Sequence, residues 1–166
     1  ITDIDGNPRP NPSGSNPDMG AYENPLGTPQ HMPITINIPD DYANIQAGLN
    51  AADSTDTVLV QPGTYYENII WPQTNGIKLL GAGDSSNTII DGGGTSSVIY
   101  MNPQTATIDT TTLIQGFKIT NGGGVATGGG LLLNSSSPKL EDLNISFNHV
   151  SGSGGGLYVS NAEPTV

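Results

Sequence analysis

The chain of 166 residues contains no cysteine, which rules out disulfide bridges, a cysteine nucleophile and cysteine-ligated zinc. Basic residues are also scarce: Lys and Arg total 4 against 15 Asp and Glu, so the net charge is −11. Such an acidic surface repels phosphate backbones and anionic lipids, and we expect neither nucleic acid nor membrane insertion. The same charge suits divalent cations and a soluble extracellular surface.

No apolar run approaches the length of a membrane span, and the residues that follow Ile1 lack the pattern of a signal peptide. If the protein is secreted, we expect its signal upstream of this sequence. Apolar residues make up only 34%, while Gly numbers 23 and Pro 13. A composition of this kind ordinarily favours disorder. Here the glycines gather at the corners of a repeat, so we interpret them as turn residues.

A repeat with an offset of 26 positions organises the carboxyl-terminal part of the chain. Gly128–Leu131 returns as Gly154–Leu157, and Ile114–Ile119 matches Leu140–Ile145. A third segment, around Pro138, recurs with the same offset. Three segments with one period of this length indicate a stacked architecture.

The spacing of apolar residues within each repeat indicates β-strands. Leu143, Ile145 and Phe147 alternate with Asn144 and Ser146, and period two is typical of a strand with one buried face. Short strands separated by Gly- and Asn-rich corners predict one turn of a parallel β-solenoid. A propeller blade would need about 40 residues, and an antiparallel β-sandwich, the remaining alternative, would not share a fixed register. The residues that we expect to face the core are Leu131, Leu133, Leu143, Ile145, Leu157 and Val159.

Residues 34–70 have the pattern of a cap and a first coil. Ile45 and Leu49 fall on one face of a short helix, for which Asp40 or Asp41 is the candidate N-cap. A small amphipathic helix of this kind covers the unpaired backbone and the apolar lumen of a first coil.

Two motifs in this part resemble the amino-terminal cap of pectate-lyase-like β-helices. The first, Ile-Gln-x-Gly-Leu-x-x-Ala, begins at Ile45, and the second, Val-Leu-Val-x-Pro-Gly-Thr-Tyr-x-Glu-Asn-Ile, begins at Val58. The resemblance implies an all-β fold: a right-handed parallel β-helix with a short amino-terminal capping helix, from a secreted or cell-surface protein of bacterial type. Residues 71–166 then form coils that share the period of the repeat and are open or truncated at the carboxyl end.

Residues 1–27 do not follow the repeat. Asp-x-Asp-Gly-Asn-Pro-Arg, starting at Asp3, and Asp-x-Gly-Ala-Tyr-Glu, starting at Asp18, resemble the closing motif that follows the last coil of bacterial secreted β-helix proteins. Here this motif comes first, and residues 28–33 read as a linker. We expect residues 1–27 to dock on the open coil of a neighbouring copy, head to tail. The alternative is that the sequence is a window from a longer protein with tandem β-helices.

The acidic positions of this first segment form the best candidate metal site. Oxygen donors at alternate positions, with a glycine that permits a tight turn, suit Ca²⁺. The alternative is an Asx-rich turn without metal. The predicted ligands are Asp3, Asp5, Asn7 and Asp18.

Aromatic residues next to the cap are the candidate carbohydrate site. Tyr65, Tyr66 and Trp71 are close enough in sequence to form a stacking platform for sugar rings, although such residues also cover caps. Asn134 and Asn144 each begin a glycosylation sequon.

Candidate catalytic groups are sparse on the coils. Pectate lyases require calcium carboxylates and an arginine base, but the one arginine, Arg9, precedes the solenoid. The carboxylates Asp91, Glu141 and Asp142 are candidates for glycoside hydrolysis, yet they are scattered and are better interpreted as solvated. We therefore predict no catalytic residue and leave open whether the protein is an enzyme.

These patterns lead to a structural or adhesive extracellular protein, with head-to-tail filament assembly, as the expected function. The alternative is a carbohydrate-active module that binds or cleaves acidic polysaccharide. A third class, a fibre like a phage tailspike, shares the fold.

Overall fold

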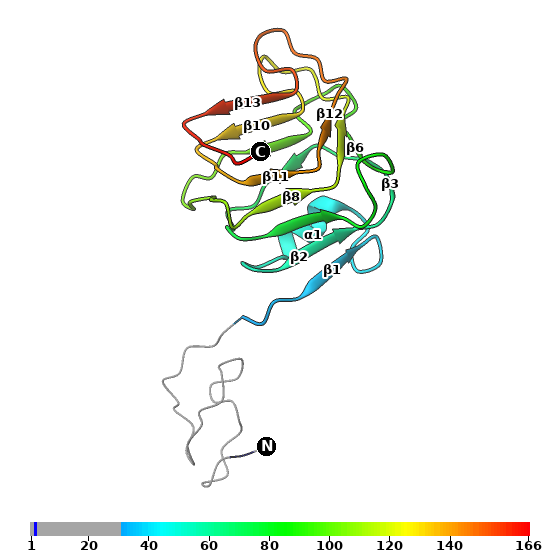
Figure 1. Cartoon of the computed structure of the whole chain (residues 1–166), viewed down its shortest axis with the longest axis vertical. Helices are drawn as coiled ribbons and strands as arrows, with labels where there is room; N and C mark the ends of the chain where they lie inside the picture. Colours follow the sequence, from blue (N-terminus) through cyan, green and yellow to red (C-terminus); the bar gives the residue numbers. More distant parts are fainter. Residues whose placement is uncertain (1, 3–30) are drawn as a thin grey trace. The chain divides into compact units, whose positions relative to one another are not determined.

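The computed structural model describes Thr2 and residues 31–166 (Figure 1). The chain divides into two units, Ile1–Pro33 and Ile34–Val166. All the helices and strands named below belong to the second unit.

Three parallel sheets form the walls of the second unit. In spatial order, the first sheet contains β1 (Thr35–Ile38), β2 (Thr57–Val60), β5 (Lys78–Gly81), β8 (Leu113–Gln115) and β11 (Lys139–Glu141). The second sheet contains β3 (Gly63–Tyr66), β6 (Thr88–Asp91), β9 (Lys118–Thr120) and β12 (Asn144–Ile145). The third sheet contains β4 (Ile69–Ile70), β7 (Ile99–Met101), β10 (Leu131–Asn134) and β13 (Leu157–Ser160). From β2 onward the chain visits the three sheets in turn, and Figure 1 shows the strands of successive coils one above another. The fold is the right-handed parallel β-helix that the sequence predicts.

The register of the last coils confirms the period of the repeat. Leu131 lies beside Leu157 in the third sheet, an offset of 26 positions, and Ile119 lies beside Ile145 in the second. Earlier coils are irregular because loops of different length join their strands. Thr57 pairs with Lys78, 21 positions later, whereas Ile69 pairs with Ile99, 30 positions later.

The corners of the coils use left-handed backbone at matched positions. Gly116, at φ 82°, corresponds to Asp142, at φ 50°, in the next coil. Asn121 and Phe147 both have φ 57°. The alternation that we predicted through Phe147 therefore stops early: β12 ends at Ile145, and the ring of Phe147 is 84% exposed because the chain turns there.

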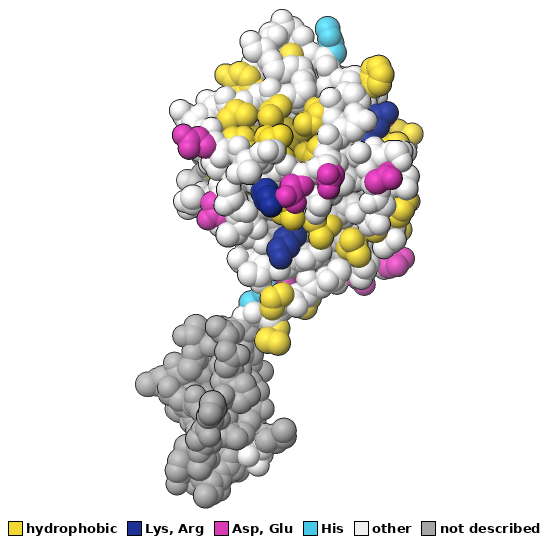
Figure 2. Space-filling view, in the orientation of Figure 1, with side chains coloured by type: hydrophobic (Ala, Val, Ile, Leu, Met, Phe, Trp, Pro, Cys, Tyr) yellow, Lys and Arg dark blue, Asp and Glu magenta, His cyan; other side chains and the backbone are white. Residues whose placement is uncertain are grey.

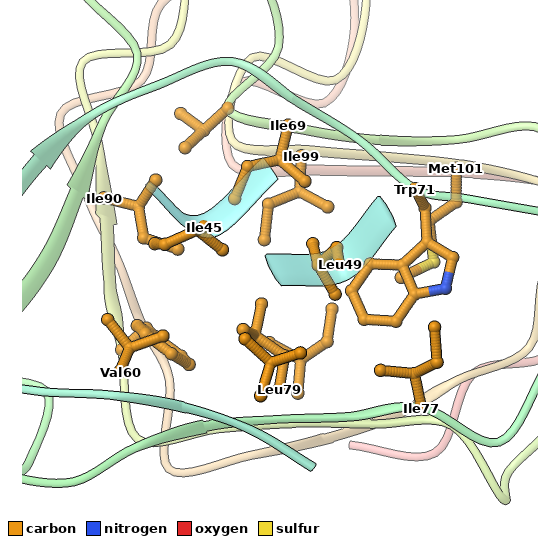
Figure 3. Close-up of a cluster of buried hydrophobic side chains, with 14 of the residues drawn as sticks. Ile45, Leu49, Val60, Ile69, Trp71, Ile77, Leu79, Ile90, Ile99 and Met101 are labelled. Atoms are coloured by element: carbon orange, nitrogen blue, oxygen red, sulfur yellow. The ribbon is translucent and has the colours of Figure 1, made fainter. Parts of the chain in front are cut away.

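Helix α1 (Ile45–Ala51) closes the amino-terminal end of the lumen. Ile45 and Leu49 are fully buried and point from α1 towards side chains of the surrounding coils, including Leu79 (Figure 3). The N-cap is Asn44 and not Asp40 or Asp41, because the Asn44 side chain accepts a 2.8 Å hydrogen bond from the N–H of Ala47. No helix in the described part of the chain has the length and apolar character needed to cross a membrane.

A glutamate of the first coil holds the helix in place. The carboxylate of Glu67 accepts hydrogen bonds from the N–H groups of Ile45, at 2.8 Å, and Gln46, at 2.9 Å. The next residue, Asn68, donates its side-chain amide to the carbonyls of Gly92 and Ser97 in the following coil. The Glu-Asn pair of the second cap motif therefore connects helix, first coil and second coil.

The predicted core stripe is buried to a depth that depends on the coil. Leu131 and Leu133 are fully buried, whereas Leu143, Ile145 and Leu157 are half-buried and pack against the core. Val159, the remaining member of the stripe, is 38% exposed. It lies on β13, which is the outermost described strand of its sheet.

Candidate functional site

An apolar stripe runs across the outer face of the third sheet. Ile70, Tyr100, Leu132 and Tyr158 are aligned partners on β4, β7, β10 and β13. Their side chains point outwards because the alternate positions, such as Leu131, fill the core. Ile70 is 64% exposed, and the other three are half-buried.

A column of neutral polar residues lies beside this stripe. The Asn134 amide donates to the Asn102 side-chain oxygen at 3.0 Å, and the Asn102 amide donates to the Tyr100 hydroxyl at 2.8 Å. Asn134 also pairs in register with Ser160 of the last coil. These bonds fix the orientation of the amides. The four residues of the stripe together with Asn102, Asn134 and Ser160 are called the third-sheet face below.

The third-sheet face has the chemistry of a sugar-binding surface. A tyrosine ring offers an apolar face for stacking, while amide and hydroxyl groups both donate and accept hydrogen bonds. Tyr100 and Tyr158 are two strands apart, which corresponds to about 10 Å. An extended polymer that lies across the strands would contact both rings. None of the residues that define this face is charged.

The structure does not bring the predicted aromatic residues onto one surface. Tyr66, on the second sheet, is 78% exposed, but Trp71 is only 3% exposed and points into the core, so the three rings do not form the predicted platform (Figure 3). The Trp71 indole N–H has no hydrogen-bond partner in the described part of the chain. Tyr65 packs against the core, and its hydroxyl donates to the Gln61 carbonyl at 2.9 Å. Burial and the nearby charge of Glu67 raise the pKa of Tyr65.

Sequence reasoning missed Tyr100 and Tyr158. A signal was present, because each lies between two apolar residues of a strand, and the central residue must then point outwards. Their alignment was not predictable, since Tyr100 lies 32 positions before Leu132 instead of 26.

The predicted calcium ligands Asp3, Asp5, Asn7 and Asp18 lie outside the described residues. In the part that is described, no group of three or more His, Cys, Asp or Glu side chains is arranged to hold a metal ion. The carboxylates considered for catalysis bind neighbours on the coils. Asp91 accepts from the Asn121 amide at 2.9 Å, and Glu141 forms a 2.7 Å ion pair with Lys139.

A second surface feature is an apolar hollow of about 490 Å³ beside β11, β12 and β13, the strands at which the three sheets end. Figure 2 shows apolar side chains gathered between these strands. Its lining residues are Gln115, Leu140, Glu141, Asp142, Leu143, Ile145, Leu157 and Val166. The hollow is the lumen of the β-helix seen from the end opposite to α1.

Comparisons of the chain with protein-family models, with curated proteins and with solved structures found no match in any of the three. The chemistry of the coils is therefore the basis for assigning a function.

Proposed function

We propose that the protein is a structural and adhesive β-helix of the secreted or cell-surface type, which holds polysaccharide along its third-sheet face. The observation that carries this proposal is the alignment of Tyr100, Leu132 and Tyr158 into one outward stripe beside oriented amides. The cap motifs, which resemble those of the pectate-lyase-like superfamily, support the same class of protein.

The polysaccharide that fits this face best is neutral. Uronate carboxylates would find no basic side chain in the third-sheet face, and the whole chain carries a net charge of −11. Neutral sugars instead combine an apolar ring face with hydroxyl groups, which match the stripe and the amide column. This favours adhesion to a neutral polymer over the binding of an acidic one.

Affinity electrophoresis in gels that contain a neutral glucan or polygalacturonate tests the proposal. We expect the glucan to retard the native chain. For Tyr158→Ala we expect a dissociation constant roughly 3- to 10-fold larger, which corresponds to the loss of one stacking contact. Tyr66→Ala is the matched control, because Tyr66 is an exposed tyrosine of the second sheet. Equal retardation of the two variants would disprove the assignment to the third-sheet face. If either polymer releases reducing ends or unsaturated product, the protein cleaves polysaccharide, and the proposed adhesive function is wrong.

Self-assembly is a second candidate function, and the apolar hollow beside β11, β12 and β13 favours it. The edge strands of three sheets surround this hollow, and edge strands can add a strand from another chain. We propose residues 1–27 of a second copy as the occupant, since their sequence resembles a closing segment. Repeated head-to-tail contact of this heterologous kind builds a filament.

Calcium bound by Asp3, Asp5, Asn7 and Asp18 remains part of the proposal. A ligand that binds only the folded state stabilises it by mass action. Melting temperatures measured with calcium and with chelator test this, and an unchanged melting temperature would contradict it.

A further inference from the structure

Among the described strands, β1 is the outermost strand of the first sheet at the α1 end, and one of its edges faces away from β2. The carbonyls of Ile34 and Ile38 accept bonds from the N–H groups of Thr57 and Gln61 on the β2 side. Backbone groups alternate along a strand, so those of Thr35 and Asn37 point to the opposite edge. An edge of this kind invites pairing with another chain.

Asp41 binds the backbone groups that Asn37 presents at this edge. Its carboxylate oxygen Oδ2 accepts the backbone N–H of Asn37 at 2.7 Å and the side-chain amide of Asn37 at 3.2 Å. Its own N–H donates to the Asn37 carbonyl at 2.8 Å. Asp41 therefore satisfies both backbone groups that a neighbouring strand would bind. Pro39, which follows the strand, has no N–H to offer.

Apolar surface adjoins the guarded edge. Ile34 is 53% exposed and Tyr42 is 40% exposed. Both residues line a hollow of about 480 Å³ together with Thr35 and Asp41. Residues 34–38 carry no charge, and the Asp41 carboxylate places a negative charge at this edge, beside the Asn37 N–H.

We infer that β1 is a latent strand-addition surface for a second copy of this chain, and that Asp41 keeps it closed. Two β1 strands related by a two-fold axis pair antiparallel, each with the same edge, and bury the two apolar patches together. With Asp41 in place, such a dimer lacks the Asn37 backbone groups and brings two carboxylates to one interface, where like charges are unfavourable. The hydrogen bonds from Asn37, its backbone N–H foremost, also hold the pKa of Asp41 below its ordinary value, as expected for a bound carboxylate.

The experiment uses the full chain with Thr35→Cys as a reporter, because the chain contains no other cysteine. In the register that places the two Thr35 residues opposite each other on the two-fold axis, their Cα atoms are about 5.5 Å apart, within reach of a disulfide. We expect Asp41→Ala to form the oxidised dimer at least about tenfold faster than the chain with native Asp41. Asp40→Ala is the matched control, since Asp40 is an exposed aspartate next to the guard. Asp41→Ala that cross-links no faster than Asp40→Ala would overturn the inference.

Hydrogen exchange of the Asn37 amide provides a second measurement, made at a protein concentration at which sedimentation shows only monomers. The expected order of exchange rates is Asp41→Ala fastest, then Asp41→Asn, then native, because a neutral amide oxygen is a weaker acceptor than a carboxylate. If Asp41→Ala does not fold, the comparison of Asp41→Asn with the native chain decides. An Asn37 amide that exchanges at the native rate in the folded variants would show that Asp41 is not the guard.

Discussion

Phe147 is a bulky residue in the left-handed backbone conformation. It holds φ 57°, a conformation that costs a bulky residue roughly 1–2 kcal/mol, and its ring is exposed. The Lys118 ammonium lies 5.6 Å from the ring centroid, a cation–π contact that returns about 0.5–1 kcal/mol. The equivalent position of the preceding coil is Asn121, a residue type that tolerates this conformation.

We predict that Phe147→Asn raises the free energy of unfolding by about 0.5–1 kcal/mol, since the relief of strain exceeds the lost cation–π contact. Urea denaturation measures the difference. Phe147→Leu is the control, because it removes the ring but keeps the strain, and it should give no gain. A loss of stability in Phe147→Asn would mean that the ring contributes more than its exposure suggests.

The hydrogen bonds of the Asp109 carboxylate lead to a prediction about pH. Its carboxylate accepts from the Thr111 hydroxyl at 2.6 Å and the Thr111 N–H at 2.9 Å, and these bonds lower the pKa of Asp109. A lowered pKa means that the contribution to stability is present above the unfolded value of about 3.9 and is lost as pH falls through the lowered pKa. We expect Thr111→Val to raise the pKa of Asp109 towards that value, as measured by a carboxyl NMR titration. The same change from Thr110→Val would refute the attribution to the Thr111 hydroxyl.

Helix α1 depends on a residue from another coil. Its first N–H groups bind the Glu67 carboxylate, and α1 has only 7 residues, too few to be stable alone. Glu67→Ala leaves two partly buried donors without their acceptor, so we expect a loss of about 1–3 kcal/mol in the free energy of unfolding. Glu67→Gln, which keeps one acceptor oxygen, should lose less. Thr64→Ala, at an exposed position of β3, which ends just before Glu67, is the control, and an equal loss there would contradict the role of Glu67.

The sequence predicted some strands and helix ends correctly and others wrongly. The repeat predicted the pairing of Leu131 with Leu157 because a constant offset of 26 positions reflects a regular coil. Coils with longer loops leave no such offset, so the stripe that includes Tyr100 was not predictable. Residue type alone favoured Asp40 or Asp41 as the N-cap of α1, but the N-cap is Asn44, and the Asp41 carboxylate binds the backbone of β1 instead. Trp71 was misplaced because residue type alone suggested a surface platform, whereas the alternation of buried Ile69 and exposed Ile70 points the next side chain, Trp71, into the core.

The two ends of the described β-helix differ, and this asymmetry bears on assembly. At one end α1 fills the lumen and Asp41 occupies the edge of β1. At the other end β11, β12 and β13 surround an apolar hollow. Association of two copies through this hollow would be either head to tail, with residues 1–27 as the donor segment, or through two hollows that face each other. The two modes differ in whether residues 1–27 take part.

Sedimentation velocity of two variants separates these modes. Val166 is 90% exposed and lines the hollow, so Val166→Asp adds a charge there with little effect on folding. Head-to-tail assembly predicts that large particles disappear both in Val166→Asp and after deletion of residues 1–27, while circular dichroism retains its β signal. Contact between two open ends predicts that Val166→Asp alone has this effect. A native chain that remains monomeric at every concentration would exclude both modes, and Thr64→Asp controls for added charge elsewhere.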